Sequence, residues 1–474
     1  MSNAVVVGAG PNGLAAAITL ARHGVEVTVL EAADEIGGGT RTSELTPGLL
    51  HDHCSAVHPM GLGSPFLRTL DLERYGLRWR WPEIDLAHPL DGGTAGVMVR
   101  SLGSTASGLG ADGRAWERLF GPLASAFDAL TEDLMRPVVN VPRHPLYLAR
   151  FGLRALLPAA VVARRFGTEE ARALFAGVAA HAFHPLDRPT SAAVGLMLIA
   201  AGHRYGWPVA EGGSRAITDA MAKMLADHGG TIETGVTVRS LDELPPADAV
   251  LLDLAPSGVV AVAGDRLPGR VRRAYRRYRH GPGAYKVDLA VDGGVPWTNE
   301  QCRRAGTVHL GGTFEEVAFA EREIHYGRMP ERPFVLVGQQ YLADPTRSAG
   351  TVHPVWTYAH VPHGYTGDAT EAVLGQLERF APGVRERIVD MRVRSTTAMA
   401  AYNANYVGGD IVTGANTPFQ VVIRPRVAMD PYSTGIPGVY LCSAATPPGA
   451  GVHGMCGFNA ASSALRSLRS PGRR

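Results

Sequence analysis

The chain opens with a pattern of apolar and polar positions that is typical of a β-α-β unit. Residues 4–7 form a continuous apolar run, as expected of a parallel strand that is buried on both faces. A glycine-rich turn follows, and an alanine- and leucine-rich stretch predicts a helix over about 14–23 with Gly24 as its stop. A second apolar run over 25–30 predicts the next strand, which ends at Glu31.

Apolar runs return late in the chain. Those at 247–252 and 438–442 predict further buried strands, and we expect helices over 216–228 and 458–468 and a strand over 231–238. The span 61–204 is mostly helical in pattern, whereas 286–424 alternates apolar and polar residues. The pattern predicts an α/β protein, α+β overall, in which a Rossmann-like domain carries an inserted domain of an antiparallel sheet roofed by helices.

The predicted domains are discontinuous. We assign 1–60, 205–285 and 425–474 to the dinucleotide-binding domain, and 61–204 and 286–424 to the substrate domain. No internal repeat of solenoid length is visible in the chain.

The first turn matches the dinucleotide fingerprint G-x-G-x-x-G in its full strand-turn-helix context. Its glycines permit a tight turn and let a pyrophosphate approach the helix N-terminus. Glu31, at the end of the second strand, can accept both hydroxyls of an adenosine ribose and would repel a 2′-phosphate. The residues predicted to form this part of the site are Gly8, Gly10, Pro11, Asn12, Gly13 and Glu31.

A second copy of the same spacing, at 108–113, lacks this context. It follows the polar stretch 101–107 and no apolar strand precedes it. We therefore predict a loop before an amphipathic helix at this position, and no nucleotide site.

A second glycine turn favours FAD over NAD. It lies just beyond Glu31, where it can fold back over the diphosphate, and its arginine can neutralise the phosphate charge. The alternative is a surface glycine turn with an exposed arginine. The residues concerned are Gly37, Gly38, Gly39, Thr40 and Arg41.

A third glycine-rich segment, 447–457, lies between the last predicted strand and the last helix. A loop of this kind at a helix N-terminus can stabilise the negative charge of a reduced flavin, and its glycines let the backbone lie flat against the ring. The candidate contacts are Gly451, Val452 and Gly454.

These three segments, together with motifs such as Asp52-His53-Cys54-Ser55-Ala56-Val57-His58-Pro59 and Tyr285-Lys286-Val287-Asp288, resemble the phytoene desaturase-related FAD oxidoreductases. The resemblance covers nearly the whole chain and is nearest the branch of pyridine nucleotide-disulphide oxidoreductase domain-containing protein 2. It implies the fold of amine oxidases and phytoene desaturases, with FAD as cofactor. It also implies a backbone contact of Val238 with the adenine, and cofactor contacts at Ala32, Val57 and Ala444.

The chain departs from many flavoproteins after its last predicted strand. Where they carry Gly-Asp to hold the ribityl chain, this sequence has Ser443-Ala444-Ala445. That contact must therefore come from backbone or from another part of the chain.

Lys286, His453 and His58 are the candidate catalytic residues, predicted to line the reactive face of the flavin because they lie in the shared motifs. Each has a structural alternative. The histidines can be hydrogen-bonded scaffold residues, and Lys286 can be a lysine on an edge strand. Lys286 is one of only two lysines among 46 basic residues.

Composition excludes several classes of function. A net charge of +2 argues against nucleic-acid binding. The four cysteines are widely spaced and form no C-x-x-C, which argues against a zinc site or redox disulfide, and no other metal site is discernible. No apolar run reaches the ~20 residues that span a bilayer, and no signal-peptide pattern is visible. We expect a cytoplasmic protein.

Two amphipathic segments, 146–165 and 270–280, could nevertheless lie in a membrane interface. Both mix apolar positions with arginines. The alternative is a packed helix with a solvated arginine face, which the pattern favours. Peripheral membrane contact therefore stays open at these two segments.

Three functions fit the pattern. The first is an FAD-dependent dehydrogenase, desaturase or oxidase that removes hydride from carbon of a largely apolar small molecule. The second is a flavin-dependent isomerase or saturase without net redox turnover, and the third is a non-catalytic escort like the Rab GDP-dissociation inhibitors. Because no second β-α-β nucleotide site is visible, we expect NAD(P)H to be a poor reductant, with oxygen, a quinone or another acceptor taking the electrons.

Overall fold

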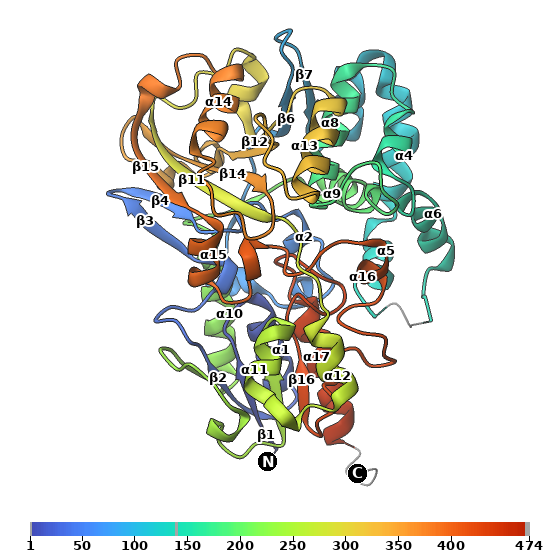
Figure 1. Ribbon diagram of the computed structural model, residues 1–474, viewed down its shortest axis with the longest axis vertical. Coiled ribbons are helices and arrows are strands. Elements are labelled where there is room, and N and C mark those ends of the chain that lie inside the picture. The colour runs from blue at the N-terminus through green and yellow to red at the C-terminus, as the bar shows by residue number, and fades with distance from the viewer. Residues whose placement is uncertain (1, 138–140, 470–474) are drawn as a thin grey trace.

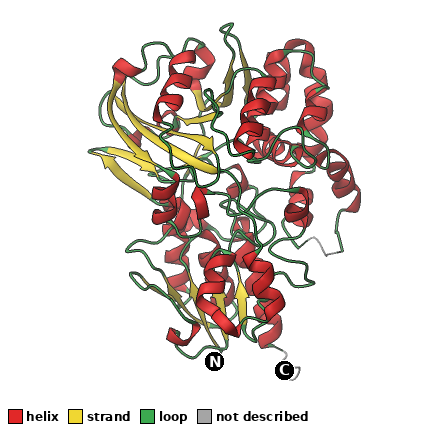
Figure 2. Ribbon diagram, viewed as in Figure 1, coloured by secondary structure: helices red, strands yellow, loops and turns green. Residues whose placement is uncertain are grey.

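The computed structural model describes residues 2–137 and 141–469. It contains two sheets, one in the lower and one in the upper part of the view in Figure 1. A group of helices lies beside the upper sheet, and Figure 2 shows strands and helices there as separate layers. The mixed α/β architecture predicted from the sequence is confirmed.

The lower sheet is the predicted Rossmann-like sheet. Its five strands are parallel throughout and come from three separate stretches of the chain. Their order is β16 (Val439–Leu441), β10 (Ala249–Leu252), β1 (Asn3–Val7), β2 (Glu26–Leu30) and β9 (Thr231–Glu233).

Helices cover both faces of this sheet. On one face α1 (Pro11–Ala21), α10 (Arg215–Asp227) and α17 (Met455–Leu468) bury alanine, leucine and methionine side chains with β1 and β2. On the other face α11 (Pro256–Ala263) and α12 (Gly269–Arg276) pack against the alternate side chains of β1 and β10. The continuous apolar runs of the sequence are explained by burial on both sides.

The upper sheet has seven strands. Their order is β15 (Ile388–Arg394), β11 (Gly283–Asp292), β14 (Val352–Val361), β13 (Val335–Gly338), β12 (Ala305–Leu310), β6 (Ile84–Pro89) and β7 (Ala95–Met98). The strands run antiparallel except for β6 and β12, which are parallel. The prediction of a purely antiparallel sheet is therefore wrong, because two strands of the span expected to be mostly helical join this sheet.

Helices also enclose the upper sheet. On one face lies α14 (Thr370–Phe380), and on the other lie α8 (Glu169–Ala180), α9 (Ala192–Tyr205) and α13 (Phe314–His325). The remaining helices are α2 (Pro59–Leu62), α3 (Leu102–Gly108), α4 (Gly113–Ser125), α5 (Phe127–Leu134), α6 (Pro145–Ala155), α7 (Ala159–Ala163), α15 (Thr396–Tyr402) and α16 (Pro418–Val422). The remaining strands are β3 (Thr42–Thr46), β4 (Leu49–Asp52), β5 (Trp79–Arg80) and β8 (Val209–Ala210).

Several predicted element boundaries differ from the structure. The strand predicted over 231–238 ends at Glu233, because the chain turns at Gly235, where φ is +73°. The segment 108–113 is not a loop: it joins α3 to α4 through a short 3₁₀ turn. Gly24 ends the first helical segment with φ of +77°, as predicted.

The two amphipathic segments behave differently. In α12, Val271 and Tyr275 are buried against β10 and its neighbours, so the membrane alternative for 270–280 is wrong. In and just after α6, Leu146, Leu153 and Leu156 are 76%, 74% and 60% exposed, so this segment keeps its apolar surface in solvent. Within the described residues, no helix is both long and apolar enough to cross a bilayer.

Candidate active site

The two glycine turns meet at the carboxyl end of the five-stranded sheet. A Cβ built on Gly38 would lie 3.2 Å from Gly10 Cα, and the Gly37 N–H donates to the Ala9 carbonyl at 2.9 Å. Helix α1 approaches β1 so closely that a Cβ on Gly13 would lie 1.9 Å from the Gly8 carbonyl oxygen. Only glycine permits this arrangement, which forms a backbone-lined cradle at the start of α1.

The first turn of α1 offers donors to an anion. Pro11 has no N–H, and Gly13 and Leu14 donate to Asp253 Oδ2 and the Gly10 carbonyl. The Asn12 N–H has no bond within the described part of the chain, and the buried Asn12 Oδ1 likewise lacks a partner there. An uncapped helix N-terminus with an orphaned polar side chain fits a bound phosphate group.

Glu31 lies at the end of β2, as predicted, but already has partners. Its carboxylate accepts from the Ala9 N–H at 2.8 Å and from the Ala33 N–H at 3.0 Å. Arg41 pairs with it at 3.1 Å, and both side chains are about nine-tenths buried. Glu31 therefore connects the first glycine turn, the end of β2 and the second glycine turn.

Arg41 and the second turn are held by a tyrosine pair that sequence reasoning missed. The Tyr402 hydroxyl donates to the Gly38 carbonyl, and the Arg41 guanidinium lies 5.3 Å from the Tyr402 ring centroid. A Cβ on Gly39 would collide with the Tyr406 hydroxyl. The predicted alternative of an exposed surface arginine is wrong, because Arg41 is 7% exposed.

The C-terminal glycine segment is brought beside the first helix. A Cβ on Gly457 would lie 1.8 Å from the Asn12 carbonyl oxygen, so α17 and α1 touch through backbone. His453 Nδ1 accepts from the Met455 N–H at 3.0 Å at the start of α17, which leaves the ring proton on Nε2. Burial lowers the pKa of His453 to about 4, so its ring is neutral.

His58 has an equally well-defined place. Its Nε2 lies 2.8 Å from Ser214 Oγ, which itself donates to the Ser55 carbonyl, so the imidazole N–H donates to the serine. The ring lies against Trp79 at 5.8 Å between centroids. Burial lowers the pKa of His58 to about 4. Both predicted histidines therefore make scaffold bonds in their neutral form.

Lys286 lies on β11 with strands on both sides, so it is not on a sheet edge and that alternative is wrong. It forms a buried ion pair with Asp288, and its ammonium lies 5.5 Å from the Trp356 ring centroid. Burial lowers its pKa, although Asp288 opposes the change. Asp288 Oδ2 and Trp356 Nε1 have no hydrogen-bond partner within the described residues. Two buried polar atoms thus face a position where a ligand or water could bind.

An aromatic row extends from this group along β14. Trp356, Tyr358 and His360 are spaced by two and lie on one face, and the Phe183 ring stacks on His360 with centroids 3.8 Å apart. Phe183 has a φ of +49°, a left-handed conformation that costs a phenylalanine energy and is found mainly at functional sites.

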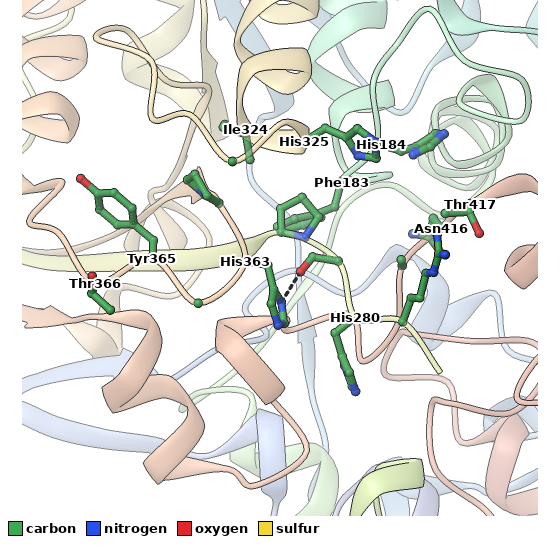
Figure 3. Close-up of a pocket in the computed structure, with 17 residues that line it drawn as sticks. Phe183, His184, His280, Ile324, His325, His363, Tyr365, Thr366, Asn416 and Thr417 are labelled. Carbon is green, nitrogen blue, oxygen red and sulfur yellow. Dashed lines mark hydrogen bonds between the residues drawn. The ribbon is translucent and has the colours of Figure 1, made fainter. Parts of the chain in front are cut away.

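Phe183 also lines a cavity of about 420 Å³. Figure 3 shows His184, His280, His325 and His363 around it, with the His363 Nδ1–H donating to the Gly281 carbonyl at 2.8 Å. The cavity therefore meets the aromatic row at one shared side chain.

The structure thus brings the predicted residues together in two groups. Tyr402 connects them: it contacts Arg41 on one side and Arg394 on the other, and Arg394 lies 4.0 Å from Asp288. The cradle group comprises Gly8, Gly10, Pro11, Asn12, Gly13, Glu31, Ala32, Gly38, Gly39, Thr40 and Arg41. Val57, Val238 and Ala444 are partly exposed; Val238 packs beside the end of β2, Val57 against the core that contains Trp356.

Sequence reasoning missed Asp253, Trp356, Tyr358, Tyr402 and Tyr406. Asp253 directly follows a predicted buried strand, a position from which polar side chains commonly reach ligands in parallel sheets. The spacing of two in Trp356 and Tyr358 also gave notice of one strand face. The tyrosines of and after α15 have no such pattern, because only packing against the cradle makes them relevant.

Comparison with known proteins agrees with this architecture. A family model described as an NAD(P)-binding Rossmann-like domain matches residues 6–70. The mouse protein named pyridine nucleotide-disulfide oxidoreductase domain-containing protein 2 is 25% identical, over 99% of this chain and 94% of its own. A Rhodobacter capsulatus phytoene desaturase (neurosporene-forming) is 24% identical, over 96% of this chain and 92% of its own.

Solved structures show the same fold. Putrescine oxidase aligns with a TM-score of 0.63 at 17% identity over 99% of both chains. An oxidoreductase from Methanosarcina mazei aligns with a TM-score of 0.60 at 18% identity, over 98% of this chain and all of its own.

Fold, dinucleotide turn and relatives together define the class: an oxidoreductase of the flavin amine oxidase and desaturase superfamily. The resemblance predicted from the sequence motifs, to phytoene desaturases and to pyridine nucleotide-disulphide oxidoreductase domain-containing protein 2, is confirmed.

Proposed function

We propose that this protein is an FAD-dependent oxidoreductase, a dehydrogenase, desaturase or oxidase, that removes hydride from carbon of a largely apolar small molecule. The observation that carries the proposal is the contact between two glycine turns at Gly10 and Gly38, with Glu31 and Arg41 behind them. A bound flavin would supply the hydride acceptor. The chain would hold the adenosine ribose through Glu31 and the diphosphate through the start of α1 and Arg41.

The polar face of β11 and β14 supports a substrate position next to the flavin. Lys286 and Asp288 form a buried charged pair whose free Asp288 oxygen can accept a hydrogen bond. His58 and His453, each neutral and anchored, would position the surrounding loops instead of exchanging protons. All three remain our candidates for the lining of the reactive face, with Lys286 the one that has an unsatisfied partner.

Aromatic side chains support an apolar substrate. Trp356, Tyr358 and Phe183 present ring faces and edges along one path from Lys286 to the 420 Å³ cavity. We propose that substrate enters through this cavity, in a protein that is cytoplasmic or bound peripherally to a membrane through the exposed leucines of α6. Electrons would leave to oxygen, a quinone or another acceptor, because the described chain shows one Rossmann-like sheet.

The identity of the cofactor provides the first test. The purified protein should be yellow and should release FAD, not FMN, on denaturation, as measured by chromatography of the supernatant. Glu31→Ala should weaken FAD binding by about 1–3 kcal/mol, because a charged acceptor of hydrogen bonds is lost. Colourless protein that cannot be reconstituted with FAD would support a non-catalytic escort instead.

Electron transfer provides the second test. A panel of apolar substrates should bleach the flavin without oxygen, whereas NADH and NADPH should bleach it slowly and without saturation. Turnover of a substrate with no net flavin reduction would identify an isomerase or saturase.

A further inference from the structure

An acidic side chain occupies the place where the diphosphate is expected. Asp253 directly follows β10, the neighbour of β1, and its Oδ2 accepts a hydrogen bond from the Gly13 N–H at 3.0 Å. The same oxygen lies 3.1 Å from a Cβ built on Gly10. The partially positive N-terminus of α1, which favours an anion, is therefore already occupied by a carboxyl group of the chain itself.

The surroundings of Asp253 disfavour its charged form. Burial is the main cause that raises its pKa to about 7, and Glu31 at the end of β2 adds to the rise. The thiols of Cys442, after β16, and Cys456, on α17, have raised pKa values and stay neutral. Within the described residues, no cation lies at salt-bridge distance from Asp253, because Arg41 is held by Glu31. Asp253 is partly exposed, so water now moderates the effect, and a ligand that displaced this water would strengthen it.

We propose that Asp253 makes dinucleotide binding proton-linked: the diphosphate binds the form in which this carboxyl is protonated. The inference rests on the proposed FAD function. In the protonated form one oxygen still accepts from the Gly13 N–H, while the other can donate its O–H to a phosphate oxygen. In the ionised form two anions would share one helix N-terminus. Binding above neutrality therefore takes up one proton from solvent, and the dissociation constant rises by up to about tenfold per pH unit.

The experiment measures FAD retention as a function of pH. Holoprotein is dialysed to equilibrium against buffers from slightly acidic to clearly alkaline, and bound and free FAD are quantified by flavin fluorescence. The wild-type dissociation constant should rise above neutrality with a slope approaching one proton per FAD. Asp253→Asn, which keeps an acceptor and a donor, should bind FAD with a flat pH profile close to the acid limit of the wild type.

A control from the other end of the same strand separates local from general charge effects. Asp248, which precedes β10, accepts from the Asn3 N–H at 3.1 Å at the amino end of the sheet. Asp248→Asn should reproduce the wild-type pH profile. Asp253→Ala provides a second uncharged variant should the asparagine variant fail to fold, and it too should show a flat profile.

The outcomes are distinct. A flat wild-type profile, or equal slopes in wild type and the Asp253 variants, would overturn the proton linkage while leaving the FAD function intact. Failure of wild type and all variants to retain FAD at any pH would overturn the proposed function itself, and the linkage with it.

Discussion

The two faces of the seven-stranded sheet differ in chemistry although the same strands supply both. One face packs against α14 and is aliphatic, with residues such as Val287, Leu289 and Val355. The other carries Lys286, Asp288, His309, Trp356, Tyr358 and His360, all of them buried. Side chains of a strand alternate between faces, so a single residue step separates the two environments.

The comparison distinguishes stability from function. Apolar burial on the α14 face stabilises the fold, by roughly 25 cal/mol per Å². Burying a lysine, an aspartate and imidazoles costs free energy unless each is paired, and here several polar atoms lack partners among the described residues. Stability therefore does not explain the second face. Its contact with Tyr402, which also contacts the cradle, relates it to the cofactor site.

The largest effect is expected from breaking the charged pair. Asp288→Ala leaves the Lys286 ammonium buried without its partner, and we expect a loss of about 3–5 kcal/mol in the free energy of unfolding, measured with urea. Replacing both residues, Lys286→Met with Asp288→Leu, should recover most of this loss.

The same variant should show a defined pH dependence. Burial lowers the pKa of Lys286, so the ammonium is less favourable in the folded than in the unfolded chain. Without Asp288 this difference grows, and the destabilisation should shrink as pH rises toward the usual lysine range. A loss that is independent of pH would contradict the assignment of the cost to the ammonium.

A comparable loss on the aliphatic face should have a different character. Leu377 of α14 is fully buried, and Leu377→Ala should cost about 2–5 kcal/mol through the lost burial and the cavity left behind. Because no charge is involved, the loss should be the same at every pH at which the protein folds, and FAD content should not change. A change in FAD affinity would show that the two faces are not independent.

Acid sensitivity should come from the polar face. Burial and the neighbouring His181 and His88 hold the pKa of His309 well below 6.5. The unfolded chain therefore binds a proton that the folded chain does not, and stability falls as pH drops below about 6.5, by about 1.4 kcal/mol per pH unit for each such histidine. His309→Gln should reduce that slope by about this amount in urea titrations across the acidic range. An unchanged slope would assign the acid sensitivity elsewhere.

The smallest effect distinguishes two buried tryptophans. Trp356 Nε1, on the polar face, has no partner in the described chain, whereas Trp297 Nε1, in the aliphatic core, donates to Gln339 Oε1 at 3.0 Å. Trp356→Phe should therefore cost about 1 kcal/mol or less. Trp297→Phe should cost more, because it adds about 1–3 kcal/mol for an unsatisfied Gln339. Thermal unfolding of the pair provides the measurement, and equal losses would mean that Trp356 also has a partner.

Local patterns were sufficient for the elements that bind the predicted nucleotide. The apolar run before Gly8, the helix before Gly24 and the acid at Glu31 are all consequences of short-range geometry, and the structure has them in place. Boundaries were less accurate: the strand after Thr231 is short because the chain leaves the sheet edge at Gly235, which periodicity alone does not report.

The parallel pairing of β6 with β12 could not be predicted in the same way. The two strands are more than two hundred residues apart, and β6 lies in a span whose other elements are mostly helical. Strand partners are selected by packing across the whole sheet, which no local window contains.

The sequence by itself determined the β-α-β unit, the glycine cradle and the resemblance to flavin oxidoreductases, because each depends on residues within one short segment. Only the tertiary structure decided that Asp253 meets Gly13, that Tyr402 contacts both Arg41 and Arg394, and that Lys286 has Trp356 beside it. Segments far apart along the chain supply these contacts. Their chemistry depends on burial and on distances of a few ångströms, quantities that exist only once the chain has folded.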